Sequence, residues 1–323
     1  MNDARRNDFI ALIRDASSPI APAKPPELGP ALEALVYPGA SPGKGRPIGG
    51  IRAVLFDIYG TLFTSAAGDI GSRDGYQRGT ELPEGVIIPQ GVNFPQGGLD
   101  TLAREFVPGC TGEELAEYFR EEVRRCHARL RPRIPYPEIK VEEIWAALFR
   151  GALARYGGTS GDPEEFALRY ELAVNPVFPK PGIPELFEKL TGRGMVLGLV
   201  SNAQFFTPLL FEAFFNRSPE ALGFDPGLLI YSFEMGEAKP SPVLFKKAAD
   251  RLNSRGIAPD RVLFVGNDML KDIYGAASMG FKTALFAGDG RSLRLREGNP
   301  LTEKLLPGGI IRFLSDIPAM IGC

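Results

Sequence analysis

The stretch RAVLFDIYG, residues 52–60, decides the fold class of this chain. Four apolar residues run without interruption into Asp57, and the stretch ends on Gly60. A short apolar run that gives way to polar residues and glycine is typical of a buried parallel strand that leads into a loop. We therefore predict a parallel strand here, with Asp57 at its carboxyl end.

Four later runs share this pattern: MVLGLVSN (195–202), LLIYS (228–232), VLFVGND (262–268) and KTALFAG (282–288). Helical sequences separate them, and these carry the expected end signals. One of them, PVLFKKAADRLNSRG, begins with proline and ends with glycine. Such alternation of strands and helices predicts an α/β protein with a Rossmann-like, doubly wound parallel sheet.

A long insertion separates the first predicted strand from the second. It spans roughly 130 residues, far more than one crossover helix needs. Residues 65–100 are rich in glycine and polar side chains, which predicts a long loop. Residues 111–175 show helical patterns and begin with the capping-box pair Thr111 and Glu114. We expect an α-helical cap inserted after the first core strand.

These patterns divide the chain into three predicted parts. Residues 1–47 form a Pro/Gly-rich N-terminal extension, residues 48–65 and 178–323 form the α/β core, and residues 66–177 form the Gly-rich loop and the helical cap. The dense proline and glycine after residue 19 predict an extended arm. This arm is either a passive linker or a docking arm for a partner subunit.

Composition excludes several functional classes. The 323 residues include 37 Lys+Arg and 39 Asp+Glu, and this balance gives no attraction to nucleic acid or to an anionic membrane. A single histidine, His127, cannot build a His-rich zinc site. Three cysteines without a CxxC pair favour a reducing compartment, and no stretch has the length of a membrane span. We expect a cytoplasmic protein without nucleic-acid or membrane partners.

Polar side chains follow four of the predicted strands, at the edge where ligands bind in open α/β sheets. They combine a candidate carboxylate nucleophile, a hydroxyl–amide pair, a cation and a second acidic cluster. In chain order they are Asp57, Tyr59, Thr61, Ser201, Asn202, Lys239, Asn267, Asp268 and Asp272.

The motifs that contain these residues resemble those of the haloacid dehalogenase-like hydrolase superfamily. They read FDIYGTL, LVSN, AKP and VGNDMLKD, in that order. The resemblance covers residues 51–65 and 178–290. It implies that Asp57 is a nucleophile that forms a covalent aspartyl intermediate.

The resemblance also implies roles for the other polar residues. Thr61, Ser201 and Asn202 would donate hydrogen bonds to the transferring group or hold the nucleophile. Lys239 would neutralise charge on Asp57 and on the substrate. The helical cap would close over the site and select the substrate.

A Mg²⁺ site is a further implication of the resemblance. Asp272, with Asp268 or Asn267, would bind the ion through oxygen atoms, together with Asp57 and the backbone carbonyl of Tyr59. The motif aligns with either Asn267 or Asp268 as the first ligand, so both assignments stay open.

Tyr59 departs from the pattern of the family's phosphatases, which usually carry an aspartate there as general acid–base. Such a group contributes about 10²–10⁴ in rate, and a phenol with an unperturbed pKa of about 10 cannot simply replace it. Either the leaving group departs without a proton, or another group, such as a cap residue or the phenol itself, supplies one. Family haloacid dehalogenases carry Tyr in a similar context and work without metal.

The acidic fourth motif, in contrast, resembles the metal-binding form. We therefore predict Mg²⁺-dependent hydrolysis of a small phosphorylated metabolite. The alternatives are metal-independent hydrolysis of a 2-haloacid, which needs an arginine to anchor the carboxylate, and a non-catalytic binding protein on this scaffold. The expected partner is a small anionic substrate, and a homodimer stays open.

Overall fold

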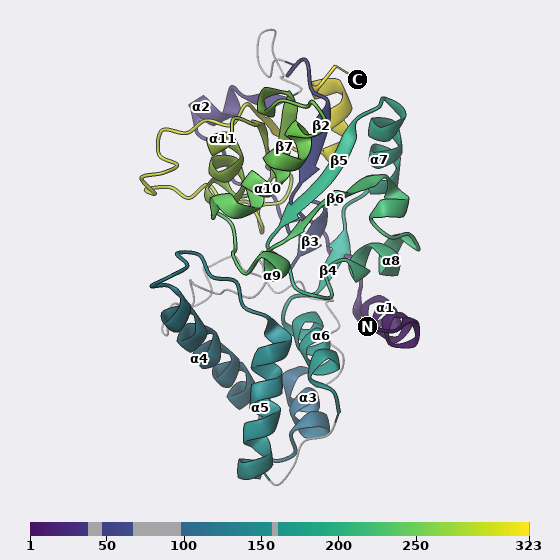
Figure 1. The fold of residues 1–323 in the computed structure, drawn as a ribbon, viewed down its shortest axis with the longest axis vertical. Helices are drawn as coiled ribbons and strands as arrows, with labels where there is room; N and C mark the ends of the chain where they lie inside the picture. Colours follow the sequence, from purple (N-terminus) through teal and green to yellow (C-terminus); the bar gives the residue numbers. More distant parts are fainter. Residues whose placement is uncertain (38–46, 67–97, 157–160, 323) are drawn as a thin grey trace.

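A seven-stranded sheet forms the centre of the computed structural model, which describes residues 1–37, 47–66, 98–156 and 161–322 (Figure 1). Every neighbouring pair of strands in it is parallel. In spatial order the strands are β1 (Val36–Tyr37), β9 (Gly309–Ile311), β8 (Lys282–Phe286), β7 (Val262–Gly266), β2 (Ala53–Phe56), β5 (Val196–Ser201) and β6 (Phe224–Tyr231). The parallel sheet confirms the predicted Rossmann-like fold class.

Helices cover both faces of this sheet. They are α7 (Ile183–Gly192), α8 (Leu209–Phe215), α9 (Ser232–Met235), α10 (Pro242–Asn253), α11 (Gly275–Ser278) and α12 (Ile317–Met320). Side chains of β2 alternate between the two faces. Val54 and Phe56 belong to the hydrophobic cluster that includes α7, whereas Ala53 and Leu55 belong to the cluster that includes α10. All four are fully buried, as the uninterrupted apolar run predicts.

Four helices form a separate helical unit, which lies in the chain between the core strands β2 and β5. They are α3 (Gly98–Phe106), α4 (Gly112–Leu130), α5 (Val141–Tyr156) and α6 (Pro163–Val174). The predicted capping box is present at the start of α4, where Thr111 and Glu114 each accept a bond from the other's backbone. Trp145 is fully buried in the unit and stacks on Phe119, with ring centroids 5.0 Å apart.

A short antiparallel ribbon connects the helical unit to the core (Figure 1). Its strands are β3 (Phe63–Ser65) and β4 (Val177–Pro179). The predicted Gly-rich loop lies largely outside the described residues. Among the residues that are described, no helix has the length and hydropathy of a membrane-spanning segment.

The N-terminal helix α1 (Asp3–Ala16) lies beside both α6 and α8. Arg5 forms an ion pair with Asp162, the N-cap residue of α6. The next residue, Arg6, forms an ion pair with Glu212 of α8. One helix thus contacts the helical unit and the core at the same time.

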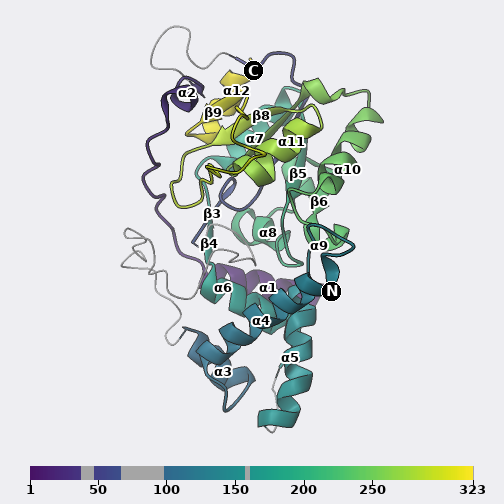
Figure 2. The ribbon, with the colours of Figure 1, turned by 90° about the vertical axis from the view of Figure 1, so that its left-hand side faces the viewer.

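The chain after α1 runs along the core toward α2 (Pro30–Glu33), as Figure 2 shows. On the way, the backbone N–H of Ala23 donates to Asp289 over 3.0 Å. The chain then supplies β1, which pairs with β9 at the edge of the sheet. The part of the extension that follows α1 therefore contacts the core and adds a strand to its sheet.

Candidate active site

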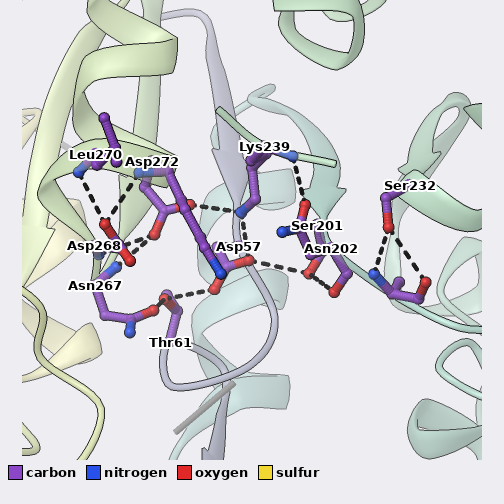
Figure 3. Close-up of polar contacts among 12 residues, drawn as sticks. Asp57, Thr61, Ser201, Asn202, Ser232, Lys239, Asn267, Asp268, Leu270 and Asp272 are labelled. Carbon is purple, nitrogen blue, oxygen red and sulfur yellow. Dashed lines mark hydrogen bonds and ion pairs between the residues drawn. The ribbon is translucent and has the colours of Figure 1, made fainter. Parts of the chain in front are cut away.

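The carboxyl ends of neighbouring strands bring the predicted polar residues together. Asp57 follows β2, Ser201 ends β5, and Asn267 follows β7. These strands are adjacent and parallel, so their carboxyl ends meet at one edge of the sheet. Lys239 reaches the same place from the segment after α9 (Figure 3).

Asp57 is held by hydroxyl and ammonium donors on both carboxylate oxygens. Its Oδ1 accepts hydrogen bonds from Ser201 Oγ over 3.0 Å and from Lys239 Nζ over 2.6 Å. Its Oδ2 lies 3.2 Å from the Thr61 hydroxyl. The residue is only 5% exposed. These contacts fix the carboxylate in one orientation at the bottom of the site.

Lys239 lies between two carboxylates. Its Nζ donates to Asp57 over 2.6 Å and to Asp272 over 2.5 Å. Burial alone disfavours the charged ammonium, but the charges of Asp272 and Asp57 outweigh it and raise the pKa of Lys239 above its ordinary value. The lysine therefore stays positively charged.

Asp272 is fully engaged by protein donors. Its Oδ1 accepts the Lys239 bond, and its Oδ2 accepts the backbone N–H groups of Asn267 and Asp268, each over 3.0 Å. Burial raises the pKa of Asp272 to about 7, with the charge of Lys239 opposing this and that of Asp57 adding to it. When all three groups are ionised, the Asp57–Lys239–Asp272 cluster has one net negative charge.

Asp268 has a different set of partners. Its Oδ1 accepts the backbone N–H groups of Leu270 and Lys271 at the start of a π-helical turn (Met269–Tyr274). Arg296 donates to both carboxylate oxygens, with Nε 3.1 Å from each. Burial raises the pKa of Asp268, but the bonds and charge of Arg296 dominate, so the pKa lies below its usual value.

Sequence reasoning missed Arg296, because no motif surrounds it. Its backbone adopts a left-handed conformation, with φ of 57°. Only a few per cent of non-glycine residues do so, and the local sequence gives no signal of it.

Asn267 and Asn202 connect the motifs to one another. Asn267 Oδ1 accepts from Thr61 over 2.9 Å, and its Nδ2 donates to the Ser292 carbonyl over 2.6 Å. Asn202 Oδ1 accepts the backbone N–H of Lys239 over 2.7 Å. The two amides thus position the residues that surround Asp57.

The Tyr59 side chain is buried and is poorly suited to act as an acid. Its hydroxyl lies 3.0 Å from Thr207 Oγ1. Burial raises the pKa of the phenol well above its ordinary value, although the bond with Thr207 opposes this. A neutral phenol with a raised pKa is a weaker proton donor than a free tyrosine.

Two side-chain oxygen atoms near Thr61 are suited to a hard cation that has few protein ligands. Asp57 Oδ2 and Asn267 Oδ1 both lie within hydrogen-bond distance of the Thr61 hydroxyl, so a carboxylate oxygen and an amide oxygen lie on the same side of the site, beside this hydroxyl. In the described ranges, no three His, Cys, Asp or Glu side chains are arranged to hold a metal ion. Mg²⁺ often uses one or two carboxylates and keeps several waters, so this donor set suits it.

A small pocket lies against this cluster. Among the described residues, its lining consists of Asp57, Tyr59, Asn202, Lys239, Asn267, Asp268, Lys271 and Asp272. This described lining includes two lysines and no arginine. It therefore offers cationic groups for an anionic substrate, together with a carboxylate nucleophile.

Two curated proteins are similar to parts of this chain. It is 31% identical over 162 residues to N-acetylmuramic acid 6-phosphate phosphatase from Pseudomonas aeruginosa, a match that covers 46% of this chain and 66% of that protein. It is 41% identical over 59 residues to glyceraldehyde 3-phosphate phosphatase from Pyrococcus furiosus. This match covers 18% of this chain and 23% of that protein. Both matches thus span less than two thirds of the relative's length.

The fold is similar to that of a solved 2-haloacid dehalogenase from Pseudomonas syringae. The identity is 19%, the TM-score is 0.51, and the match covers 84% of this chain and 97% of that one. Residues 51–280 match the family model of the haloacid dehalogenase-like hydrolases. This range contains the whole cluster around Asp57, and the chain belongs to the haloacid dehalogenase-like hydrolase family.

Proposed function

We propose that this hydrolase removes phosphate from a small phosphorylated metabolite, with Asp57 as nucleophile and Mg²⁺ as cofactor. The observation that carries the proposal is the buried Asp57–Lys239–Asp272 cluster. Its net negative charge suits a divalent cation, and its lysine suits an anionic substrate. Both curated relatives are phosphatases by name, which supports the same chemistry.

In the first step, a carboxylate oxygen of Asp57 attacks phosphorus, and the bond from phosphorus to the leaving oxygen breaks, so that the leaving group departs as an oxyanion and takes its proton from water. Ser201 and Thr61 hold the carboxylate in orientation through the bonds described above. Lys239 offsets negative charge at the reacting group. Water then attacks the aspartyl phosphate, which releases inorganic phosphate and restores Asp57.

Bound Mg²⁺ would supply further neutralisation of the phosphoryl charge. Asp57, Asn267 and the Tyr59 carbonyl would hold the ion. Both oxygens of Asp272 and of Asp268 already accept hydrogen bonds from protein groups. Asp268 is ion-paired with Arg296, whereas the Asn267 oxygen accepts a bond from the neutral Thr61 hydroxyl, which favours Asn267 over Asp268 as the ligand of the fourth motif.

We also propose that the helical unit acts as a cap over the pocket and that the substrate is small and anionic. The ribbon of β3 and β4, which connects this unit to the core, begins close to Asp57 in the chain. Cytoplasmic location, the absence of nucleic-acid partners and a homodimer stay predictions from the sequence.

Hydrolysis of a 2-haloacid is the second candidate, and Tyr59 favours it because a halide leaves without a proton. The lack of an arginine among the described pocket residues argues against it, since the substrate carboxylate needs an anchor. A binding protein without activity is the third reading. It conflicts with the complete set of hydrogen-bonded groups around Asp57.

A substrate panel separates these functions. The purified chain is assayed with aryl and sugar phosphates and with 2-chloropropionate, each in Mg²⁺ and in EDTA. The proposal predicts phosphate release that requires Mg²⁺ and no chloride release. Chloride release in EDTA would establish the dehalogenase instead, and no turnover of any substrate would favour the binding protein.

A further inference from the structure

The loop between α4 and α5, residues 131–140, reaches from the helical unit to the core. Pro137 of this loop forms an isolated antiparallel bridge with Glu237. Beside the bridge, the Ala238 N–H donates to the Tyr136 carbonyl over 2.8 Å, and the Glu138 N–H donates to the Gly236 carbonyl over 3.0 Å. The loop therefore pairs with the core backbone directly before Lys239.

The Glu138 side chain adds a second attachment to the core. Ser232 Oγ donates to Glu138 Oε2 over 2.5 Å, and Gln204 Nε2 lies 3.3 Å from Glu138 Oε1. Ser232 and Gln204 are buried, with exposed fractions of 0% and 1%. A carboxylate that accepts hydrogen bonds from buried core donors is a strong attachment.

Gln204 binds the same loop and the first residue of α5 through its other contacts. Its Nε2 donates to the Ile139 carbonyl over 2.9 Å, and its Oε1 accepts the Val141 N–H over 3.2 Å. Its own N–H donates to Thr207 Oγ1, the atom that bonds to the Tyr59 hydroxyl. Tyr59 thus holds a core loop that in turn holds the helical unit.

These attachments lead directly to the groups around Asp57. Ser232 Oγ accepts the N–H of Ala203 over 2.8 Å, and Ala203 follows Asn202 (Figure 3). Asn202 in turn accepts the N–H of Lys239. The core loop with Ser201 and Asn202 and the segment with Lys239 are therefore tied together at the place where Glu138 binds.

We propose that Glu138 is a positioning residue: it docks the helical unit on the core and fixes the Ser201–Asn202 loop and the Lys239 segment in the geometry that Asp57 requires. Glu138 itself does not touch the reacting groups. The docking part stands on the hydrogen bonds alone, whereas the effect on turnover rests on the proposed phosphatase function.

The test compares Glu138→Ala, Glu138→Gln and Ser232→Ala with the control Glu143→Gln. Glu143 is an exposed acid of α5, so its change removes the same charge from the same helical unit. Glutamine at 138 keeps one acceptor oxygen but replaces the other with a donor, so it should fall between wild type and alanine. Hydrogen exchange by mass spectrometry and kcat/KM are measured for these four variants and for the double variant of Glu138→Ala and Ser232→Ala.

If Glu138 docks the helical unit, amide exchange in the peptide that contains Ala238 should be faster in Glu138→Ala and in Ser232→Ala than in the wild type. The control should exchange at the wild-type rate. It also predicts a fall in phosphatase kcat/KM of about 10- to 100-fold, with kcat affected. The variant that carries both Glu138→Ala and Ser232→Ala should lose less than the sum of the two single losses, since the two residues share the bond between Ser232 Oγ and Glu138 Oε2.

Unchanged exchange at Ala238 in both variants would overturn the docking role. Faster exchange with wild-type kcat/KM, or additive losses in the double variant, would overturn the positioning role. If the wild-type chain hydrolyses none of the phosphates, the proposed function fails, and exchange still decides whether Glu138 docks the helical unit. Circular dichroism shows whether each variant is folded.

Discussion

At the scale of single residues, the site depends on one buried cation shared by two buried carboxylates. Lys239 has a side chain that is 2% exposed, as is that of Asp272. Removing the lysine leaves two buried carboxylates without a countercharge. Lys239 is therefore a structural requirement of the site as well as a part of its chemistry.

Lys239→Met should lower the free energy of unfolding by about 3–5 kcal/mol at pH 8. The loss should be smaller at pH 5.5, because Asp272, whose pKa is already raised to about 7, takes up a proton and no longer carries a buried charge. Urea denaturation at both pH values measures this. Lys246→Met, at an exposed ion pair with Asp250, should change stability by less than about 0.5 kcal/mol. Equal losses at the two pH values would contradict the role of Asp272.

The pH dependence of turnover should report the same carboxyl group. With a pKa of about 7, Asp272 is protonated below that pH and ionised above it. The ionised form keeps Lys239 in place and adds the negative charge that suits Mg²⁺. We expect kcat/KM to rise with pH up to about 7 and then level off. The residual activity of Asp272→Asn should lack this rise, which would show that titration of the substrate's phosphate does not cause it. An identical rise in the variant would assign the rise to another group.

Tyr59 should make the rate depend on the leaving group. A buried phenol with a raised pKa donates no proton readily, so wild-type kcat/KM should fall steeply as the leaving-group pKa rises across a series of aryl phosphates. Tyr59→Asp should flatten this dependence if the new carboxyl acts as an acid. Tyr59→Phe serves as the control, since it removes the hydroxyl without adding an acid, and should keep the steep slope. A shallow slope in the wild type and in Tyr59→Phe would show that another group protonates the leaving oxygen.

At the scale of elements, the turn after β2 brings the chain close to the fourth motif. Gly60 has φ of 83°, and a Cβ there would lie 2.6 Å from Ser292 Cβ and 2.7 Å from Asn267 Nδ2. Both the left-handed backbone and the close approach require glycine.

Gly60→Ala should cost about 1–2 kcal/mol for the backbone conformation and about 1–3 kcal/mol more for the steric clash. It should also displace Asn267 and abolish most activity. Gly194→Ala is the matched control, because φ is 73° there and no atom of the residues that the structure describes lies within 4 Å of the position that its new methyl group would take. Thermal unfolding and phosphate release measure both effects. Similar activity in the two variants would show that the close approach is not required.

The sequence predicted the central strands better than the short ones. The five apolar runs fall in β2, β5, β6, β7 and β8. Of these, β2, β5, β7 and β8 lie inside the sheet, where burial on both faces favours uninterrupted apolar runs. The strand β6 lies at an edge and begins at Phe224, before the apolar run at 228–232. The edge strand β1 has two residues, and β3, β4 and β9 have three each. Such short segments show no periodicity, and pairing with distant strands defines them.

At the scale of the whole molecule, contacts between distant segments connect the parts. α1 bonds to α6 and α8 over separations of 157 and 206 residues. Glu138 is 94 residues from Ser232. Nothing in the local sequence marks such pairs, so Glu138, Gln204, Ser232 and Arg296 could not be predicted. The motif residues could, because each follows a recognisable strand whose position in the sheet is fixed by the fold.

The most direct test of the central claim is to trap the covalent intermediate on Asp57. The chain is mixed with a good aryl phosphate and Mg²⁺, quenched rapidly in acid, digested and analysed by mass spectrometry, beside Asp57→Asn and the exposed control Asp260→Asn. We predict a phosphoryl group on the peptide that contains Asp57 in the wild type and in Asp260→Asn. Asp57→Asn should show neither this adduct nor turnover. Phosphate release by Asp57→Asn at a wild-type rate would contradict the account.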